Sequence, residues 1–515
     1  MKLGTARARY AALESDRRPF LARGQEAAKL TIPSLLPPDG HTAASDLPTP
    51  YQGLGARGLR NISSRLLLAL FPPNAPFFQF RVDEQLADAA SGSKGAAEVD
   101  ETLVKMERMV QAEMEVRHVR IAAEEGLQHL ALCGNVLKYL PKEGIPRVFP
   151  LSQYVVERDG EDNLLEVVIK ENVALTMLKP KDQQAVLKAG SGQGGGDPTE
   201  EQKTKSVCVY THIFKSGRKF TTYQEANGVI LSGSKGSYRP RTLPWRALRF
   251  HRVAGEAYGR GLVEEYLGDL KSMEALSRSM VEMGAAASKI LFMVRPGAYT
   301  TPRALSRKPN GAFIVGAEGD VSTLQADKFN DLRTVDAVMN RLETRLEHAF
   351  LLNSAFQRSG ERVTAEEIRR MGEDLEMALG GAYSILALEM QLPIVEIMVD
   401  HLKSSGKFPA LDDDTIRPSI VTGLEALGRG SDFHRITSFL QTAASTVGPE
   451  ALQTYVDAGA VLKNLANASG LDGASLMKDP EVVAQEQQQA QMQAMVDRLG
   501  PEAIKQLGQQ NQAPA

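Results

Sequence analysis

The sequence carries one motif with the spacing of a known phosphate-binding turn. Gly53, Gly55 and Gly58 form a G-x-G-x-x-G pattern, which in dinucleotide-binding domains cradles a pyrophosphate between a strand and the next helix. That role requires a strand directly before the first glycine. Here residues 48–51, Pro-Thr-Pro-Tyr, precede it, and they do not read as a strand. A dinucleotide-binding enzyme using residues 53–58 is therefore an unfavoured alternative, and close packing or a turn is the better explanation.

Other residues capable of chemistry are scattered. The sequence has no G-x-x-x-x-G-K-[ST] loop, no G-x-S-x-G elbow and no H-x-x-x-H pair. Cys133 and Cys208 are far apart and lack metal-ligand spacing, so both are expected to be free thiols in a reducing compartment. We therefore expect no catalytic residues, no metal and no cofactor.

Two clusters of positive charge are the remaining candidate sites. One contains Arg303, Arg307 and Lys308, in a Pro/Gly-rich stretch without acidic residues. The other contains Arg358 and Arg362, in a polar loop. In a monomer both would ordinarily be solvated loops. In a ring of identical subunits each arginine would become a circle of positive charge, facing a partner or a phosphate backbone.

The overall composition limits the class of protein. With 515 residues the chain is long enough for two to four structural regions. The net charge of -3 excludes a polycation that coats nucleic acid, although DNA remains possible as a partner. No apolar run approaches the roughly 20 residues that a membrane span needs, and no secretory signal is recognisable. The protein is therefore expected to work in a cytoplasm or in something assembled there.

The first half of the chain is predicted to contain both helices and a sheet. Apolar periodicity and proline stops predict helices over 5–30, 51–70 and 98–132. A polar, Gly-rich loop is expected over 189–205. Short β-branched and aromatic runs separated by Gly, Asp and Asn predict strands over 136–140, 147–157, 164–170, 206–215 and 219–224.

The middle of the chain has the pattern of a stalk that carries a small module. A helix over 262–289 is followed by an insert, 290–327, with strand-like runs at 290–294 and 312–315. A second helix is predicted over 328–352. Its apolar residues recur at intervals of three and four, a seam suited to packing on another helix. These residues are Leu332, Val335, Met339, Leu342 and Leu346.

The last third is predicted to be mainly helical. Thr364 and Glu367 form a capping-box pattern at the start of a third long helix, which Gly380-Gly381 should weaken and Pro393 should bend. A linker with an Asp run leads to a helical region at about 432–468, and the final residues are a Gln-rich tail. The fold class is therefore α+β, mainly helical.

Several stretches resemble the portal, or head-to-tail connector, proteins of podoviruses, the short-tailed double-stranded-DNA bacteriophages. They occur in the family's order over roughly residues 15 to 475. The two most specific are Glu264 to Leu270, preceded by Gly259-Arg260, and Gly360 to Arg369. The others are Leu30 to Leu35, Gly55 to Leu59, Leu68 to Pro72 and Thr422 to Ala426.

The resemblance implies a portal architecture with an α/β wing, a two-helix stem, a β-containing clip and a helical crown. In this chain it assigns 1–261 to the wing, 262–289 and 328–352 to the stem helices, 290–327 to the clip, 353–363 to a tunnel loop, 364–431 to the C-terminal part of the wing with its kinked helix, 432–475 to the crown and 476–515 to the Gln-rich tail.

The resemblance also implies the function. The chain would be a structural subunit of a ring, typically of twelve copies, at one vertex of the virion capsid, assembled in the host cytoplasm. The ring would pass double-stranded DNA during packaging and ejection without reading its sequence. Its other partners would be the terminase, a tail adaptor, the major capsid or scaffold protein and internal core proteins, with no membrane. A helical scaffold or adaptor without a DNA channel is the remaining alternative.

Overall fold

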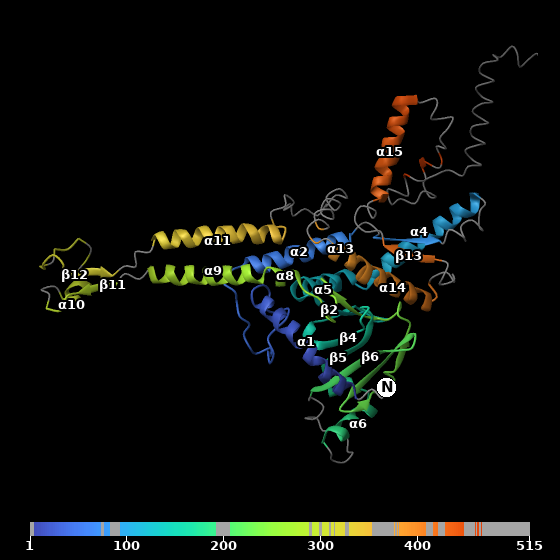
Figure 1. Cartoon of the computed structure of the whole chain (residues 1–515), viewed down its shortest axis with the longest axis horizontal. Helices are drawn as coiled ribbons and strands as arrows, with labels where there is room; N and C mark the ends of the chain where they lie inside the picture. Colours follow the sequence, from blue (N-terminus) through green and yellow to red (C-terminus); the bar gives the residue numbers. More distant parts are fainter. Residues whose placement is uncertain are drawn as a thin grey trace, which may run out of the picture. The chain divides into compact units, whose positions relative to one another are not determined.

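The computed structural model gives the chain a mixed architecture of long helices and antiparallel sheets (Figure 1). By contacts the chain divides into two compact units, Met1–Ala426 and Leu427–Ala515. The residues that the structure describes are 5–73, 77–82, 93–191, 206–287, 291–297, 301–307, 309, 311–313, 315–324, 329–352, 375, 379, 381–407, 416–420, 428–447, 459, 461, 462 and 465.

The described helices include most of those predicted from sequence. They are α1 (Ala6–Lys29), α2 (Leu54–Leu70), α4 (Ser93–Val116), α5 (Val119–Cys133), α6 (Pro180–Ser191), α8 (Leu262–Glu265), α9 (Leu267–Ala287), α10 (Pro302–Ser306), α11 (Phe329–Ala349), α13 (Gly381–Leu386), α14 (Leu392–Ser404) and, in the second unit, α15 (Gly428–Val447). Short 3-10 turns are η1 (Leu151–Gln153) and η2 (Leu175–Met177), and η3 (Ala387–Gln391) is a π-helical turn.

Two helices that the apolar periodicity predicts as continuous are interrupted. The prediction of one helix over 98–132 is wrong, because His118 adopts a left-handed conformation (φ 53°) between α4 and α5. A residue whose backbone is in the left-handed conformation ends a right-handed helix. The predicted helix over 262–289 breaks at Tyr266, between α8 and α9. The spacing of apolar residues indicates which face of a helix is buried. It does not reveal a single residue at which the helix is interrupted.

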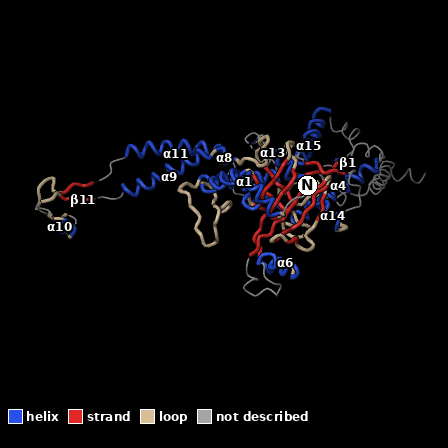
Figure 2. Tube along the Cα trace, turned by 60° about the horizontal axis from the view of Figure 1, so that its bottom comes forward, coloured by secondary structure: helices blue, strands red, loops and turns tan. Residues whose placement is uncertain are grey.

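Among the described residues, the strands form four antiparallel sheets. The largest has the order β4-β5-β6-β7-β8, with β9 also paired to β7. Figure 2 shows most of the strands, in red, gathered in one region of the chain. A three-stranded sheet has the order β10-β2-β3, and β1-β13 and β11-β12 form two-stranded sheets. The strands are β1 (Phe78–Val82), β2 (Asn135–Tyr139), β3 (Arg147–Phe149), β4 (Tyr154–Arg158), β5 (Leu164–Ala174), β6 (Ser206–Ser216), β7 (Lys219–Ala226), β8 (Val229–Ile230), β9 (Gly236–Tyr238), β10 (Trp245–Arg249), β11 (Leu291–Val294), β12 (Val321–Leu324) and β13 (Ile416–Ile420).

Four of the strand predictions over residues 135–226 are confirmed, and the fifth, over 147–157, is divided by η1 into β3 and β4. One strand prediction in the insert is wrong. Ala312, Phe313 and Val315 are exposed and belong to no strand, and β11 pairs instead with β12, Leu291 opposite Leu324. The strand was predicted from the apolar run at 312–315, and β12, which is only four residues long, was not predicted. Short apolar runs do not by themselves identify a strand.

One face of the large sheet is covered by α1. Tyr10 and Leu13 of this helix pack against Val155, Val168 and Tyr210. These apolar contacts fix the helix across strands β4 to β6, and burying each side chain stabilises the fold by about 2 kcal/mol.

A buried polar network joins the same helix to the sheet. Arg9 contacts Glu166 and Glu157 at 2.5 and 2.7 Å, and the fully buried His212 lies 2.6 Å from Glu166 and 2.8 Å from the Tyr223 hydroxyl. Burial raises the pKa of Glu166, but hydrogen bonds from His212 and Arg9 outweigh burial and lower it to about 2. Glu166 is therefore a carboxylate with its partners in place, a structural arrangement rather than a reactive one.

The third helix region meets the end of α2. Pro393 lies in the first turn of α14, and the predicted bend there takes the form of the preceding π-turn η3, which accommodates the missing backbone donor. The buried Gln391 donates its side-chain N–H to the carbonyl of Leu70, and the Tyr383 hydroxyl donates to Ala69 at 3.3 Å. These bonds use carbonyls that the last turn of α2 leaves without helical partners.

Candidate functional site

The two long helices that flank the insert, α9 and α11, lie side by side (Figure 1). The structure places all five predicted seam residues on α11. Leu346 is fully buried, Met339 and Leu342 pack against the main core, and Leu332 and Val335 are half-buried. Leu270 and Met273 are the corresponding buried residues on α9. Burial therefore decreases along the pair toward the insert.

The C-terminal end of α11 is held by α2. A Cβ atom at Gly58 would lie 2.6 Å from the ring of Phe350, so only glycine allows this approach. The Asn61 side chain donates to the carbonyls of Phe350 and Leu351 at 2.8 and 3.1 Å, and Leu351 has a left-handed φ of 52°. The chain therefore enters residues 353–363 from a fixed point.

Three ion pairs set the rotation of α9 and α11 against their neighbours. Arg57 on α2 contacts Glu347 on α11 at 3.0 Å. Arg345 on α11 contacts Asp269 on α9, and Lys271 on α9 contacts Glu26 on α1 at 2.6 Å. At least one partner in each pair is about half exposed, so each pair contributes at most about 1 kcal/mol. Their effect is to orient the helices.

The start of the helix pair crosses the turn between α5 and β2 at very short range. A Cβ atom at Gly134 (φ 74°) would lie 2.2 Å from the carbonyl carbon of Arg260, and one at Gly261 would lie 2.6 Å from the carbonyl oxygen of Leu132. The buried Asn135 side chain donates to the carbonyl of Gly259 at 2.8 Å and accepts from its N–H at 2.7 Å. Two backbone segments far apart in sequence are thus locked together.

A ladder of charges lies directly before α8. The guanidinium of Arg260 contacts Glu256 and Glu264, both at 2.7 Å, and Arg23 contacts Glu264 at 2.8 Å. The Phe20 ring lies beneath both arginines, 4.7 Å from Arg23 and 5.1 Å from Arg260. The hydrogen bond from Arg260 lowers the pKa of Glu256, which favours its carboxylate form. Sequence reasoning singled out this stretch only through the family resemblance, because its partners in α1 are distant.

The insert places its basic residues on the surface. Arg303 on α10 and Arg307 directly after it are exposed, and Lys308 lies outside the described residues. The side chains of Met293, Phe313 and Val315 are exposed as well, Phe313 completely. A small module that exposes large apolar side chains beside arginines has the composition of a contact surface.

The other predicted basic cluster, Arg358 and Arg362, lies outside the described residues. So do Thr364 and Glu367 and most of the third predicted helix before Gly381. Of this region the structure describes Leu352 at one side, α13 at the other and, before α13, the helical residues Leu375 and Leu379, which are buried in the main core.

The G-x-G-x-x-G pattern proves to be a packing motif. No described residue between 30 and 53 forms a strand, so the turn that a dinucleotide requires is absent. A Cβ atom at Gly55 would lie 2.3 Å from the carbonyl oxygen of Leu30, and Gly58 faces Phe350. The first glycine, Gly53, has open space around it. The glycines allow α2 to approach two other segments.

The remaining described residues offer few groups for chemistry. The described residues include no group of three or more His, Cys, Asp and Glu side chains placed to hold a metal ion. Among the same residues, no helix is long and apolar enough to cross a membrane. Burial raises the pKa of Cys133 to about 12, so its side chain remains a thiol.

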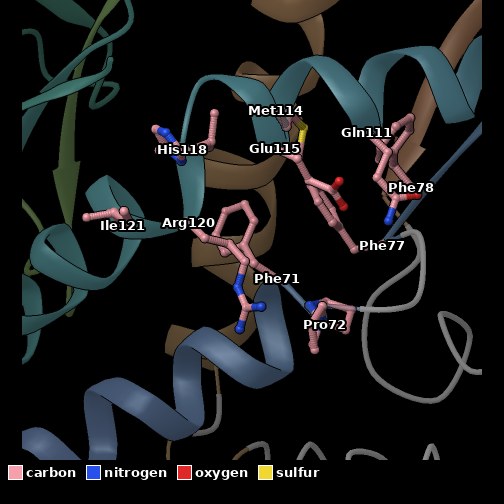
Figure 3. Close-up of a pocket in the computed structure, with 12 residues that line it drawn as sticks. Phe71, Pro72, Phe77, Phe78, Gln111, Met114, Glu115, His118, Arg120 and Ile121 are labelled. Atoms are coloured by element: carbon pink, nitrogen blue, oxygen red, sulfur yellow. The ribbon is translucent and has the colours of Figure 1, made fainter.

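An apolar cavity lies where the end of α2 meets the junction of α4 and α5 (Figure 3). Its volume is about 190 Å³, and its lining includes Phe71, Phe77, Met114 and Ile121. Figure 3 labels the aromatic residues Phe71, Phe77 and Phe78 in this lining. The lining is mostly apolar, and its polar members are Gln111, Glu115, His118 and Arg120.

Comparison with known proteins identifies the family. The family of bacteriophage head to tail connecting proteins matches residues 3–477. The portal protein of Escherichia phage T7 is 39% identical over 500 residues, which covers 96% of this chain and 91% of that protein. The portal protein of Enterobacteria phage T3 is 36% identical over 504 residues, with the same coverage. A solved chain from the neck of an empty GTA particle is 10% identical, covers 75% of this chain and 86% of its own, and has a TM-score of 0.38.

The resemblance first noted in residues 259–270 and 360–369 is therefore confirmed over nearly the whole sequence. Both relatives are portal proteins of bacteriophages. This chain belongs to the bacteriophage head-to-tail connecting protein family, as a portal subunit of the virion.

Proposed function

We propose that the chain closes into a ring of about twelve copies at one capsid vertex and that double-stranded DNA passes through the centre of the ring. The match to portal proteins over nearly the full length carries this proposal. Support comes from the α9–α11 pair, where the side chains of Val281 and Val338 are 57% and 41% exposed. Apolar side chains on a long helix pair suit a head-to-tail contact with the next subunit, which closes when the rotation does.

The regions of a portal map onto the described elements as follows. The stem is α8, α9 and α11, and the clip is the insert with β11, α10 and β12. The wing is residues 1–261 with 364–431, and 353–363 is the tunnel loop. The crown is 432–475, which includes most of α15, and its start lies near the boundary between the two units at 426 and 427. The Gln-rich tail, 476–515, follows.

The solution mass tests this proposal. Native mass spectrometry of the purified chain should give a species near twelve times the subunit mass of 56.0 kDa. Dissociation to monomer at every concentration would instead favour the helical adaptor, which needs no ring. Replacing Val281 and Val338 by Asp should reduce ring formation, because each copy would then bury charges at the interface.

The implied partners follow from the family role. The terminase and then the tail adaptor would dock at the clip, whereas the capsid or scaffold protein would contact the wing and the internal core proteins the crown. ATP hydrolysis would belong to the terminase, consistent with the missing phosphate loop in the sequence. DNA contacts would be independent of base sequence, since they address phosphates.

The arginines of the tunnel loop provide a test of the channel. Replacing both Arg358 and Arg362 by Ala should weaken DNA retention, because two rings of positive charge that contact phosphates would be lost. The measurement is the fraction of particles that keep a full-length genome after packaging. Normal packaging and normal retention by rings of the double variant would show that these residues do not contact DNA.

The basic residues of the clip provide a second test. Replacing Arg303, Arg307 and Lys308 by Ala should weaken binding of the tail adaptor at least about tenfold if each charge contributes about 0.5 kcal/mol or more. Binding can be measured on assembled rings by surface plasmon resonance. A matched variant that replaces the exposed Arg18, Lys181 and Lys188 by Ala removes the same charge elsewhere and should bind normally. Equal affinity of both variants would contradict the docking role.

A further inference from the structure

A second cavity, of about 400 Å³, lies beside the loop that joins β9 to β10. Three cations converge on it from segments that are far apart in sequence: Lys142 after β2, Lys219 at the start of β7 and Arg239 after β9. All three residues are exposed, so their charged ends are accessible from solvent. Neither basic cluster that the sequence suggests includes any of them.

The cavity has an excess of positive charge. Asp400 is its single carboxylate, and His401 is the remaining titratable group apart from Tyr238. Burial lowers the pKa of His401, and the charges of Arg117 and Lys142 lower it further, so the imidazole is neutral at pH 7. Among the described residues, no acidic side chain forms an ion pair with Lys142 or Lys219. The lining therefore holds three cations and one carboxylate.

The polar lining is of the type that contacts phosphates. Ser237, Thr242 and Tyr238 supply hydroxyl groups beside the three cations. Lysine, arginine and hydroxyl side chains provide most protein contacts to phosphate oxygens. A protein partner would instead require apolar anchors in the centre of the contact, and here only Tyr238 and Pro244 could serve.

One further exposed cation, Lys215, continues the surface on the other side of the same loop. It lines a neighbouring cavity of about 340 Å³ together with Glu389, Arg158 and Arg246, and both arginines are half-buried and already donate to backbone carbonyls. Lys215 and Lys219 lie at the two ends of the tight β6–β7 turn, so this turn borders both cavities. Lys215 together with the three cations Lys142, Lys219 and Arg239 suits a chain of phosphates better than a single small anion, because successive phosphates can each meet a cation.

We propose that this cavity, formed by Lys142, Lys219 and Arg239, binds phosphate groups of the DNA backbone, as a contact separate from the channel. This inference rests on the proposed function in one respect, namely that double-stranded DNA passes through the assembled ring. The site lies on the sheet region and not on the stem, clip or tunnel loop. It would give the ring a hold on DNA at a second position, again without reading base sequence.

The test measures the salt dependence of duplex binding. A labelled 20-base-pair duplex is titrated with the wild-type chain and with a Lys142→Ala/Lys219→Ala/Arg239→Ala variant over a range of NaCl concentrations. Losing three phosphate contacts should reduce the slope of log K against log[NaCl] by about 2.7, at roughly 0.9 per contact. The Arg18→Ala/Lys181→Ala/Lys188→Ala variant carries the same change in net charge and should keep the wild-type slope.

A further substitution separates a lost contact from a damaged fold. Asp400→Asn removes the single carboxylate of the cavity and should tighten duplex binding, which a structural defect would not do. Thermal unfolding in inorganic phosphate, compared with chloride at equal ionic strength, distinguishes a site for free phosphate from a site for the DNA backbone. A thermal shift with phosphate in the wild type alone would assign the site to free phosphate, and duplex binding without such a shift would assign it to the DNA backbone.

Three outcomes would overturn the proposal. The first is an equal salt-dependence slope for the two triple variants. The second is that the wild-type chain binds neither the duplex nor inorganic phosphate. The third is that poly-glutamate binds as tightly as the duplex and that the Lys142/Lys219/Arg239 variant loses affinity for both equally. The last would make the cavity a protein-docking site. Ring formation and the Arg358/Arg362 variant are measured separately, so failure of the channel proposal would be distinguishable from failure of this one.

Discussion

Replacing Gly134 by Ala is expected to lower the free energy of unfolding by about 2 to 5 kcal/mol. Two effects add at this position. Its left-handed φ of 74° costs a residue with a Cβ atom about 1 to 2 kcal/mol. The new Cβ would also lie 2.2 Å from the carbonyl carbon of Arg260, and overpacking costs about 1 to 3 kcal/mol. Because the opposing atoms belong to the backbone, no side chain can rotate away.

Two control substitutions separate these effects. Gly255 has a similar φ of 81° but open space around it, so Gly255→Ala should cost about 1 kcal/mol through backbone conformation alone. Gly261 has no positive φ, yet its Cβ would lie 2.6 Å from the Leu132 carbonyl oxygen, so Gly261→Ala reports the clash. Urea denaturation at fixed subunit concentration measures all three. If Gly134→Ala destabilised the protein no more than Gly255→Ala, the close approach of Gly134 to the segment directly before α8 would be wrong.

Replacing Lys138 by Met is expected to stabilise the protein at neutral pH by about 3 to 5 kcal/mol. Lys138 lies on β2, is only 2% exposed, and its amine has no hydrogen-bond partner among the described residues. Burial lowers its pKa from 10.5 to about 7, although the charge of Glu125 raises it in part. At about 1.4 kcal/mol per pKa unit, that difference is the free energy lost by keeping the amine buried. Methionine fills similar space without a polar atom.

The stability difference between the wild type and Lys138→Met is expected to depend on pH. Between pH 10.5 and about 7 the unfolded chain binds a proton at Lys138 that the folded chain does not. The wild type should therefore lose stability as pH falls through this range, and the loss should level off below about 7. The difference in unfolding free energy between wild type and Lys138→Met should follow that curve. Lys142→Met, at an exposed lysine nearby, should show no such difference, and a flat difference for Lys138→Met would contradict the burial.

Local patterns predicted the elements of the fold well. The helices at α1, α2 and α11 and the run of strands from β2 to β7 follow apolar periodicity and turn residues, which act over a few residues at a time. The breaks at His118 and Tyr266 were missed because each depends on one residue whose conformation is set by tertiary contacts. The strand β12 was missed because its partner lies 30 residues earlier, beyond the loop that contains α10.

The candidate sites were predicted less completely, for a related reason. Clusters of charge that are contiguous in the chain, such as Arg303 to Lys308, can be recognised directly in the amino-acid sequence. The cavity of Lys142, Lys219 and Arg239 is assembled by sheet pairing from three separate segments, so no local pattern reveals it. The same holds for the ladder of Arg23, Arg260 and Glu264. The glycines at 53–58 show the opposite case, in which a familiar pattern serves packing instead of phosphate binding.

Electron-microscope class averages of the purified chain would show whether it forms a ring around a central channel. Closed rings of about twelve subunits with a central hole are expected, and fewer rings when Val281 and Val338 are replaced by Asp. Particles that remain monomeric at high concentration, or that form open assemblies without a hole, would contradict a DNA channel and with it the roles assigned to Arg358 and Arg362.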